Sequence, residues 1–205
     1  MSLTVTRWWW VRHAPVINPD GTIYGSTDPI ADVSDTASFD GLARKLPPGA
    51  VWVTSHLTRA RQTAEGIRAA GLDTGTPRVE PDLGEQNFGA WHGLSYEEVD
   101  RAMGGHRFWL APARHRPPEG ESFVELIERA VPVILRLTAE HVGRDIVCVA
   151  HGGTIRAAVA HALGLDPEIA LRISTVNLGI TRLDHLGEDG RADAWRVGWI
   201  NLAPK

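Results

Sequence analysis

The sequence predicts a three-layer α/β/α sandwich with a mainly parallel central sheet. Three short apolar runs, residues 8–11, 50–53 and 146–150, have the length and the Val, Ile or Trp content of strands that are buried on both faces. Stretches with helical spacing follow the second and third runs. Strand alternating with helix is typical of such a sheet. A chain of 205 residues fits one domain of this kind, and we expect residues 1–205 to form it.

Three helices are expected. Residues 57–70 carry alanine and isoleucine at helical spacing, and the Ala-rich segment 154–163 follows the third apolar run; both end at a glycine. A longer amphipathic stretch covers residues 122–141, with one apolar stripe along it. Pro132 falls inside this stretch, so we expect a kink or a break there.

The C-terminal part is expected to add strands. Residues 173–174, 180–183 and 195–200 have strand composition, and the segment 187–190, Gly-Glu-Asp-Gly, is a turn signal between the last two. No internal repeat or linker divides the chain, which supports the single domain.

Composition excludes several classes of protein. With 21 basic and 25 acidic residues the net charge is -4, which argues against a general nucleic-acid binder. No apolar run approaches the roughly 20 residues that cross a membrane, and no signal peptide is visible at the N-terminus. The single cysteine, Cys148, lies in an apolar run and reads as a buried thiol in a reducing compartment. We therefore expect a cytoplasmic protein without a membrane partner.

The ends of the three apolar runs carry the polar residues. Arg12 and His13 follow the first run, residues 55–59 follow the second, and His151 and Gly152 follow the third. Ligands of open α/β sheets bind beyond the carboxyl ends of the strands. The fold would therefore bring two histidines and at least two arginines to one rim of the sheet.

This set of side chains suits phosphoryl transfer. Arg12 and Arg59 offer planar, permanently charged forks for phosphate oxygens. His151 precedes a helix start whose backbone N–H groups bind anions. His13, as a neutral imidazole, would attack phosphorus and become a phosphohistidine.

Four segments then resemble one family. They are residues 11–14, Val-Arg-His-Ala; residues 55–64, Ser-His-Leu-Thr-Arg-Ala-Arg-Gln-Thr-Ala; residues 83–93, Leu-Gly-Glu-Gln-Asn-Phe-Gly-Ala-Trp-His-Gly; and residues 150–153, Ala-His-Gly-Gly. In this order they resemble the motifs of the histidine phosphatase superfamily, the phosphoglycerate mutase-like proteins. The resemblance implies the phosphoglycerate mutase-like fold.

The resemblance also implies roles for particular residues. His13 would be phosphorylated, Arg12, Arg59 and His151 would bind the phosphoryl group, and Glu85 would be the proton donor. Glu80, Asp82 and Glu121 remain alternatives to Glu85. The scheme needs no cofactor or metal, and the sequence has no metal-ligand spacing such as His-Glu-x-x-His.

The remaining substrate contacts are expected from the loops. Residues 24–28 resemble the family's loop near the phosphate, so Tyr24, Gly25 and Ser26 are expected to bind substrate, together with Asn18 and Gly152. The family's glycine after the nucleophile is replaced by Ala14, followed by Pro15. A methyl group fits there if the backbone keeps a negative φ.

A cap is expected over residues 94–120. Arg107, Arg114 and Arg116 lie in this proline-bearing stretch, either as a solvated loop or as a cap that contacts a second group of the substrate. Ser122, which follows, would cap the next helix or point toward the phosphate.

The function expected is hydrolysis of a small phosphorylated metabolite by a metal-independent phosphomonoesterase of the histidine acid phosphatase type. A phosphoglycerate mutase-type transfer is the first alternative, disfavoured because the segment between the glutamate motif and residues 118–120 is short. A non-catalytic phospho-ligand binding module and a zinc hydrolase are the others. The physiological substrate and the oligomeric state stay open.

Overall fold

Strand β1 (Val5–Arg12) lies inside the sheet, between β4 (Asp145–Ala150) and β5 (Ile180–Leu186). The computed structural model describes residues 4–18, 20–104, 111–187 and 194–205. Its sheet has the strand order β3-β2-β4-β1-β5-β6. The other strands are β2 (Val51–Thr54), β3 (Arg78–Val79) and β6 (Trp195–Leu202). The pairs from β3 to β1 are parallel and the last two are antiparallel, which confirms the mainly parallel sheet.

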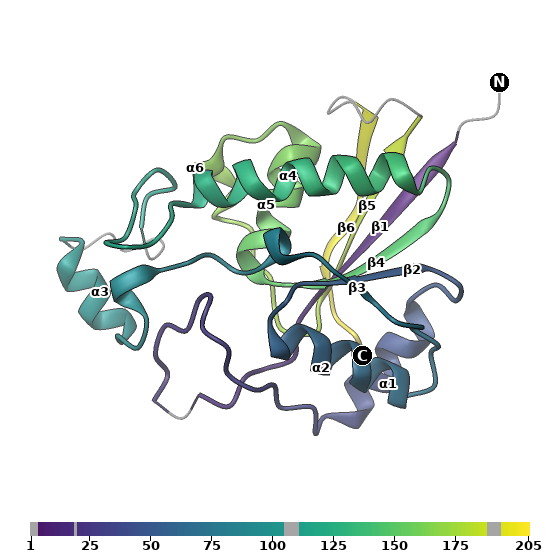
Figure 1. The fold of residues 1–205 in the computed structure, drawn as a ribbon, viewed down its shortest axis with the longest axis horizontal. Helices are drawn as coiled ribbons and strands as arrows, with labels where there is room; N and C mark the ends of the chain where they lie inside the picture. The colour runs from purple at the N-terminus through teal and green to yellow at the C-terminus, as the bar shows by residue number, and fades with distance from the viewer. Residues whose placement is uncertain (1–3, 19, 105–110, 188–193) are drawn as a thin grey trace.

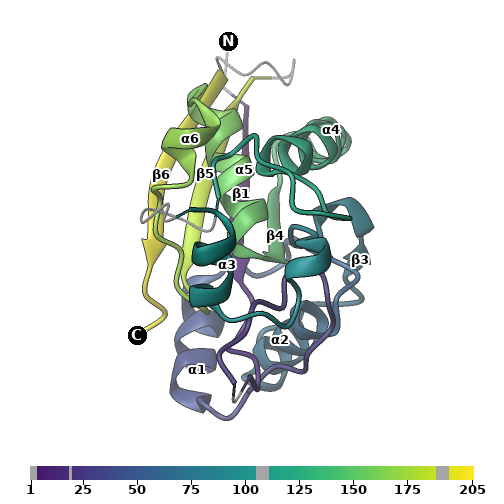
Figure 2. The same ribbon diagram turned by 90° about the vertical axis from the view of Figure 1, so that its left-hand side faces the viewer.

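Helices cover both faces of this sheet (Figure 1). In the view turned by 90°, α1 and α2 lie on one side of the strands and α4 and α5 on the other, as the predicted three layers require (Figure 2). The helices are α1 (Thr36–Lys45), α2 (Thr58–Ala69), α3 (Tyr96–Ala102), α4 (Phe123–Glu140), α5 (Gly152–Leu163) and α6 (Pro167–Ala170), with the 3-10 turns η1 (Pro81–Leu83) and η2 (Gly89–Trp91).

The tryptophan run in β1 explains how the layers are held. Trp8 and Trp10 are fully buried and stack at 4.9 Å between ring centroids, in a core that also contains side chains of α4 and α5. Val11 points to the opposite core, which α1 and α2 share. Each such buried side chain contributes roughly 1.5–3 kcal/mol. A strand with apolar neighbours on both faces reads as a continuous apolar run, and its last residues reach the edge of the sheet.

Helix α4 runs unbroken through Pro132, so of the two alternatives predicted there, a kink or a break, the break is wrong. Proline there removes the hydrogen bond to the carbonyl of Glu128. Because Pro132 lies on the exposed side of the helix, water can bind that carbonyl instead. A capping box formed by Ser122 and Glu125 starts the helix, and a long buried stripe holds it against the core. Ser122 is thus the N-cap, the first of its two expected roles.

The strand predicted at residues 173–174 is also wrong, because this segment is a loop before β5. The carbonyl of Ile173 accepts a hydrogen bond from Nε of Arg156 at 2.7 Å instead of joining a ladder. Helix α5 begins at Gly152, two residues earlier than predicted. Of the turn predicted at residues 187–190, residues 188–190 lie outside the described residues. None of the helices in the described ranges is long and apolar enough to cross a bilayer.

Candidate active site

Three strand ends meet at one edge of the sheet, as predicted. The backbone N–H of His13, after β1, donates to the carbonyl of Ala150 at the end of β4, at 2.9 Å. The rings of His13 and His151 lie 5.1 Å apart between centroids. From the end of β2, Oγ of Ser55 hydrogen bonds Nε2 of His151 at 2.7 Å. In Figure 1 this edge faces α3 and the loop before residue 31.

His13 is fully buried and is held in one orientation. Its Nδ1 lies 2.6 Å from the carbonyl oxygen of Ala14, and since a carbonyl only accepts, Nδ1 carries the proton. Nε2 therefore has a lone pair, and it has no hydrogen-bond partner among the described residues. Burial, and next the charge of Arg59, hold the pKa of His13 well below 6.5. The ring is therefore neutral, which is the state that the predicted nucleophilic role requires.

His151 is the second buried imidazole. Its pKa is also held well below 6.5, first by burial and then by His13 and Arg59. Nε2 is taken by Ser55, while Nδ1 has no partner within the described part of the chain. Helix α5 begins at the next residue, Gly152, so its free N–H groups open beside the ring. The helix N-terminus, with its free N–H groups, suits an anion.

Arg59 carries a buried guanidinium that binds the backbone of the loop formed by residues 24–27. Its two terminal nitrogens donate to the carbonyls of Gly25 and Thr27, each at 2.6 Å, and it lies over the ring of Tyr24 at 5.1 Å. Gly25 has a φ of +40°, and a Cβ there would lie 2.6 Å from the ring of Phe88. Only glycine fits this position, and its carbonyl is one of the two that accept from Arg59.

Arg12 and Arg156 add positive charge near the start of α5. Arg12 donates to the carbonyl of Thr175 at 2.5 Å. Arg156, which the sequence analysis missed, is 7% exposed, and burial lowers its pKa to about 10 although Glu85 opposes this. The sequence around Arg156, an Ala-rich helical segment, does not indicate that this side chain is buried near Glu85. Arg12, Arg59 and Arg156 outnumber the carboxylates of Glu85 and Asp28 that act on them, so the site keeps an excess of positive charge, which suits a phosphomonoester anion.

Glu85 is the acid that faces these groups. Its carboxylate accepts hydrogen bonds from the N–H of Gly153 at 3.1 Å and of Gln86 at 3.0 Å. Burial lowers the pKa of Arg59, and the charge of Glu85 opposes this shift.

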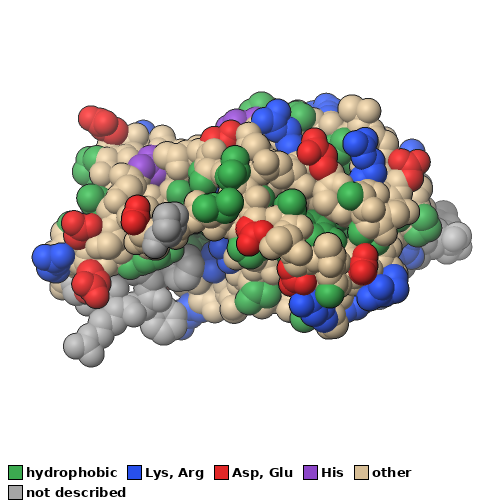
Figure 3. Space-filling view, turned by 90° about the horizontal axis from the view of Figure 1, so that it is seen from below, with side chains coloured by type: hydrophobic (Ala, Val, Ile, Leu, Met, Phe, Trp, Pro, Cys, Tyr) green, Lys and Arg blue, Asp and Glu red, His purple; other side chains and the backbone are tan. Residues whose placement is uncertain are grey.

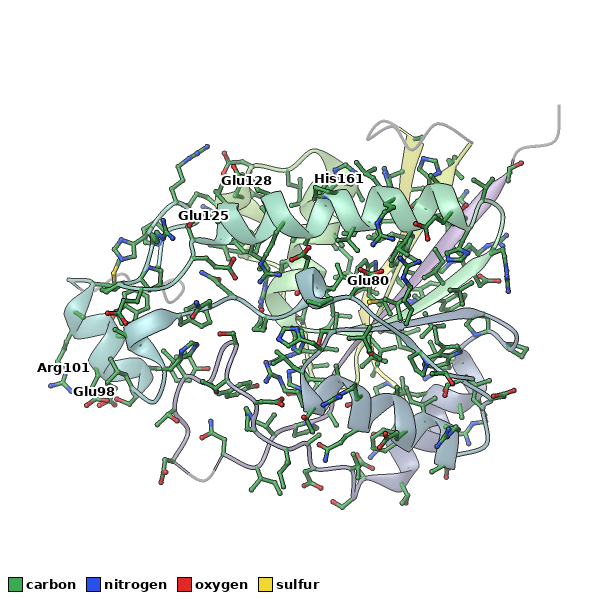
Figure 4. The ribbon with its side chains drawn as sticks, in the orientation of Figure 1. Glu80, Glu98, Arg101, Glu125, Glu128 and His161 are labelled. Atoms are coloured by element: carbon green, nitrogen blue, oxygen red, sulfur yellow. The ribbon has the colours of Figure 1, made fainter. Side chains whose placement is uncertain are left out.

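The alternative acids have other partners. Glu80, labelled in Figure 4, pairs with Arg78 at 2.6 Å and with Arg136 at 2.9 Å. Glu121 pairs with Arg129 at 2.6 Å. Asp82 is exposed. Glu85 is therefore the only one of the four predicted candidates that contacts the start of α5.

Ala14 fits after the nucleophile. It is not among the residues of positive φ, and its N–H donates to Oγ1 of Thr63 at 2.8 Å. Asn18 bonds within its own loop, where Nδ2 donates to the carbonyl of Thr22 at 2.8 Å. Ser26 lies 3.5 Å from Nε2 of His92, a longer contact. The structure thus brings Tyr24 and Gly25 to Arg59, while Asn18 is engaged by its own loop.

The predicted cap, residues 94–120, contains α3, and Val99 of this helix packs in a small apolar cluster with Ile23 and Trp91, which precede the cap in the chain. Its base is closed by the N–H of Ala90 donating to the carbonyl of Pro118 at 2.9 Å. Glu98 and Arg101 lie at its outer end in Figure 4.

The three arginines predicted in the cap differ in their surroundings. Arg116 donates to the carbonyl of Gly120 at 2.7 Å and pairs with Glu125 at 3.3 Å. Arg114 is exposed, and Arg107 lies outside the described residues.

The chain is similar in sequence and fold to known proteins of one family. The sequence model of the histidine phosphatase superfamily (branch 1) matches residues 9–198. The chain is 34% identical over 179 residues to glucosyl-3-phosphoglycerate phosphatase of Mycolicibacterium vanbaalenii, covering 80% of this chain and 76% of that one. It is 33% identical over 129 residues to a 2,3-bisphosphoglycerate-dependent phosphoglycerate mutase of Gloeobacter violaceus, covering 59% and 58%.

A solved structure agrees in fold. The mycobacterial glucosyl-3-phosphoglycerate phosphatase superposes with a TM-score of 0.82 at 27% identity, covering 97% of this chain and 100% of that one. The fold and the matches define an enzyme of the phosphoglycerate mutase-like class. The chain belongs to the histidine phosphatase superfamily, branch 1. The predicted family, fold and phosphatase activity on a phosphate monoester are confirmed.

Proposed function

We propose that this enzyme hydrolyses small phosphomonoesters through a phosphoryl group carried on Nε2 of His13. The observation that carries the proposal is the pair of buried, unpartnered ring nitrogens, Nε2 of His13 and Nδ1 of His151, beside Arg12 and Arg59. Other buried polar atoms in the described part of the chain, such as Nε1 of Trp10 and of Trp52, also lack hydrogen-bond partners, but these two ring nitrogens belong to rings that lie 5.1 Å apart at the ends of β1 and β4. A phosphoryl group supplies partners for both.

The first step forms a bond between Nε2 of His13 and phosphorus and breaks the bond to the leaving oxygen. Arg12, Arg59 and His151 would hold the equatorial oxygens, and Glu85 would pass its proton to the leaving oxygen. In the second step Glu85 takes a proton from water, the hydroxide attacks phosphorus, and the bond to His13 breaks. Inorganic phosphate leaves and the enzyme is restored.

The substrate class follows from the relatives and the cap. Glucosyl-3-phosphoglycerate phosphatases are similar over most of the chain, so we propose a phosphate ester of a small sugar or hydroxy acid, bound with its leaving group under residues 94–120. We propose that the cap belongs to one domain formed by residues 1–205. Mutase activity would need water excluded from the phosphohistidine, and the short segment between residues 93 and 118 favours hydrolysis.

A panel of phosphorylated metabolites tests this function. The panel contains glucosyl-3-phosphoglycerate, 3-phosphoglycerate, sugar phosphates and p-nitrophenyl phosphate, with phosphate release and 2-phosphoglycerate formation measured in parallel. Hydrolysis unaffected by chelator supports the proposal. Transfer to 2-phosphoglycerate would indicate a mutase, zinc-dependent activity a metallohydrolase, and binding without turnover a phospho-ligand binding module.

Two further expectations concern the cell. The buried free thiol of Cys148 supports the proposed cytoplasmic location, which fractionation tests. Acidic and basic side chains are interspersed on the face in Figure 3, which supports the expectation that nucleic acid is not a partner; titration with a mixed-sequence duplex tests it.

A further inference from the structure

The peptide bond that joins His13 to Ala14 is held at both ends by side chains from distant parts of the chain. The carbonyl oxygen of His13 accepts from Nδ2 of Asn177 at 2.8 Å. The N–H of Ala14 donates to Oγ1 of Thr63 at 2.8 Å. The ring of His13 donates from Nδ1 to the next carbonyl, that of Ala14, at 2.6 Å. The orientation of the ring is therefore tied to the orientation of this peptide.

Thr63 connects the peptide to the phosphate side of the site. It is fully buried in α2, one turn after Arg59, and its hydroxyl donates to the carbonyl of Arg59 at 2.7 Å. A carbonyl only accepts, so the hydroxyl proton goes to Arg59 and an oxygen lone pair receives Ala14. One hydroxyl thus fixes the nucleophile relative to the backbone that carries a phosphate-binding arginine.

Asn177 stands on a loop that is itself rigidly held. The next residue, Leu178, has a φ of +60°, an uncommon conformation for a side chain of this size. Its N–H donates to the carbonyl of Arg12 at 2.9 Å, and the carbonyl of Gly179 accepts from the N–H of Arg12 at 3.1 Å. Oδ1 of Asn201 fixes the N–H of Val176 at 2.6 Å. The Asn177 amide therefore approaches His13 from a fixed support.

We propose that Thr63 and Asn177 are positioning residues that clamp the peptide between His13 and Ala14 and thereby aim Nε2 of His13 at phosphorus. The inference rests on the proposed role of His13 as the nucleophile. If the clamp opens, the peptide turns, the Ala14 carbonyl moves, and the imidazole that hangs from it moves as well. In-line attack depends on sub-ångström placement, and a misplacement of about 1 Å can cost on the order of 100-fold in rate.

The test compares threonine variants of equal burial. Thr63→Val removes the hydroxyl at nearly constant volume, and Thr63→Ser keeps it. Thr138→Val is the matched control, because Thr138 is 1% exposed, donates to the carbonyl of Ile134 at 2.7 Å in the same helical manner, and accepts from Nε1 of Trp8 at 2.9 Å. Both valine variants leave one buried N–H without its acceptor, but only Thr63 touches the His13 peptide.

Two quantities are measured for each variant: the single-turnover rate of p-nitrophenolate release at enzyme excess, and the dissociation constant of inorganic phosphate. We expect Thr63→Val to lower the rate by roughly 10- to 100-fold, with phosphate affinity within about 3-fold of wild type, since a rate loss without a binding loss marks misalignment. Thr63→Ser should restore most of the rate. Thr138→Val should keep the wild-type rate.

Asn177→Ala gives a second, independent arm and decides the matter if Thr63→Val does not fold. It should show the same loss of rate at nearly unchanged phosphate affinity. The clamp is refuted if the deciding variant keeps its rate within about 3-fold of the Thr138→Val control, or loses phosphate affinity in proportion to rate. His13→Ala separates this from the function: activity without His13 overturns the nucleophile itself, whereas a trapped His13 adduct with an undisturbed Thr63→Val rate overturns only the clamp.

Discussion

The carboxylate of Glu85 rests on the first turn of α5, where its two oxygens lie 3.1 and 3.3 Å from the N–H of Gly153. A Cβ at Gly153 would lie 2.4 Å from Oε1 of Glu85 and 2.8 Å from Cδ2 of Leu126. The Glu85 carboxylate and the first turn of α5 therefore pack directly against each other.

Glu85→Gln should slow the enzyme according to the leaving group. An alkyl leaving group needs a proton in the transition state, so its phosphoryl transfer to His13 should fall by about 100-fold or more. Transfer from p-nitrophenyl phosphate should fall far less, because p-nitrophenolate leaves without a proton. Single-turnover rates on both substrates measure this. Equal losses on the two substrates would show that Glu85 is not the acid, and Glu121→Gln and Asp82→Asn would be measured next.

Gly153→Ala should reproduce part of that pattern while keeping Glu85 as a carboxylate. The added methyl group displaces Glu85 from the start of α5, so transfer from alkyl phosphates should fall by roughly 10- to 100-fold, the scale of a misplaced catalytic group. Gly198→Ala is the control, since a Cβ there meets only Arg182 side-chain atoms, at 3.3 Å and beyond. A Gly153→Ala enzyme with wild-type rates on alkyl phosphates would contradict the described packing.

Much of this arrangement was predictable because it follows from the ends of strands. The tryptophan run ending in Arg12 and His13 marks a strand buried on both faces, and parallel strands bring their carboxyl ends together. The wrong strand at residues 173–174 shows the limit: β-branched composition favours strands, yet tertiary contact with Arg156 decided the conformation.

The two residues that bind the His13–Ala14 peptide, Thr63 and Asn177, could not be predicted from the ends of strands. Thr63 and Asn177 lie 49 and 164 residues from the groups they bind. Neither belongs to a local pattern that indicates a contact with His13, since Thr63 reads as an ordinary helical residue and Asn177 as a loop residue. Such contacts depend on how α2 and the loop before β5 pack against β1, and hydrophobic periodicity does not specify that packing.

Arg59→Lys should weaken phosphate binding although the charge is kept. Lysine lacks the planar guanidinium, whose Nε has no hydrogen-bond partner among the described residues and can donate to phosphate, and a hydrogen bond to a charged group is worth roughly 1.5–3 kcal/mol. We expect the dissociation constant of inorganic phosphate to rise by roughly 10- to 100-fold, measured by calorimetry. Arg61→Lys, on the exposed side of the same helix, is the control. Equal affinities in the two variants would mean that Arg59 does not bind phosphate.

Stability should fall in acid because of the buried histidines. The pKa of His13 and the pKa of His151 are both held well below 6.5, mainly by burial, so below that pH the unfolded chain binds more protons than the folded chain. Stability is then full above the unfolded pKa and is lost as pH falls toward the folded pKa, by up to about 1.4 kcal/mol per pH unit for each group.

His13→Gln should make this loss shallower by up to about 1.4 kcal/mol per pH unit between about pH 6.5 and 5. Urea unfolding at several pH values measures it, and exposed His56, changed to Gln, is the control. Identical pH dependence in His13→Gln and wild type would show that His13 is not held neutral by the fold.

The most direct test of the account is to identify the phosphorylated residue during turnover. Wild-type enzyme mixed with labelled p-nitrophenyl phosphate and quenched within one turnover should carry an acid-labile, base-stable phosphoryl group, and peptide mapping should place it on His13. His13→Ala should carry none and lose all but a trace of its activity. Label on another residue, or a His13→Ala enzyme that keeps more than a few per cent of wild-type turnover, would contradict the central claim.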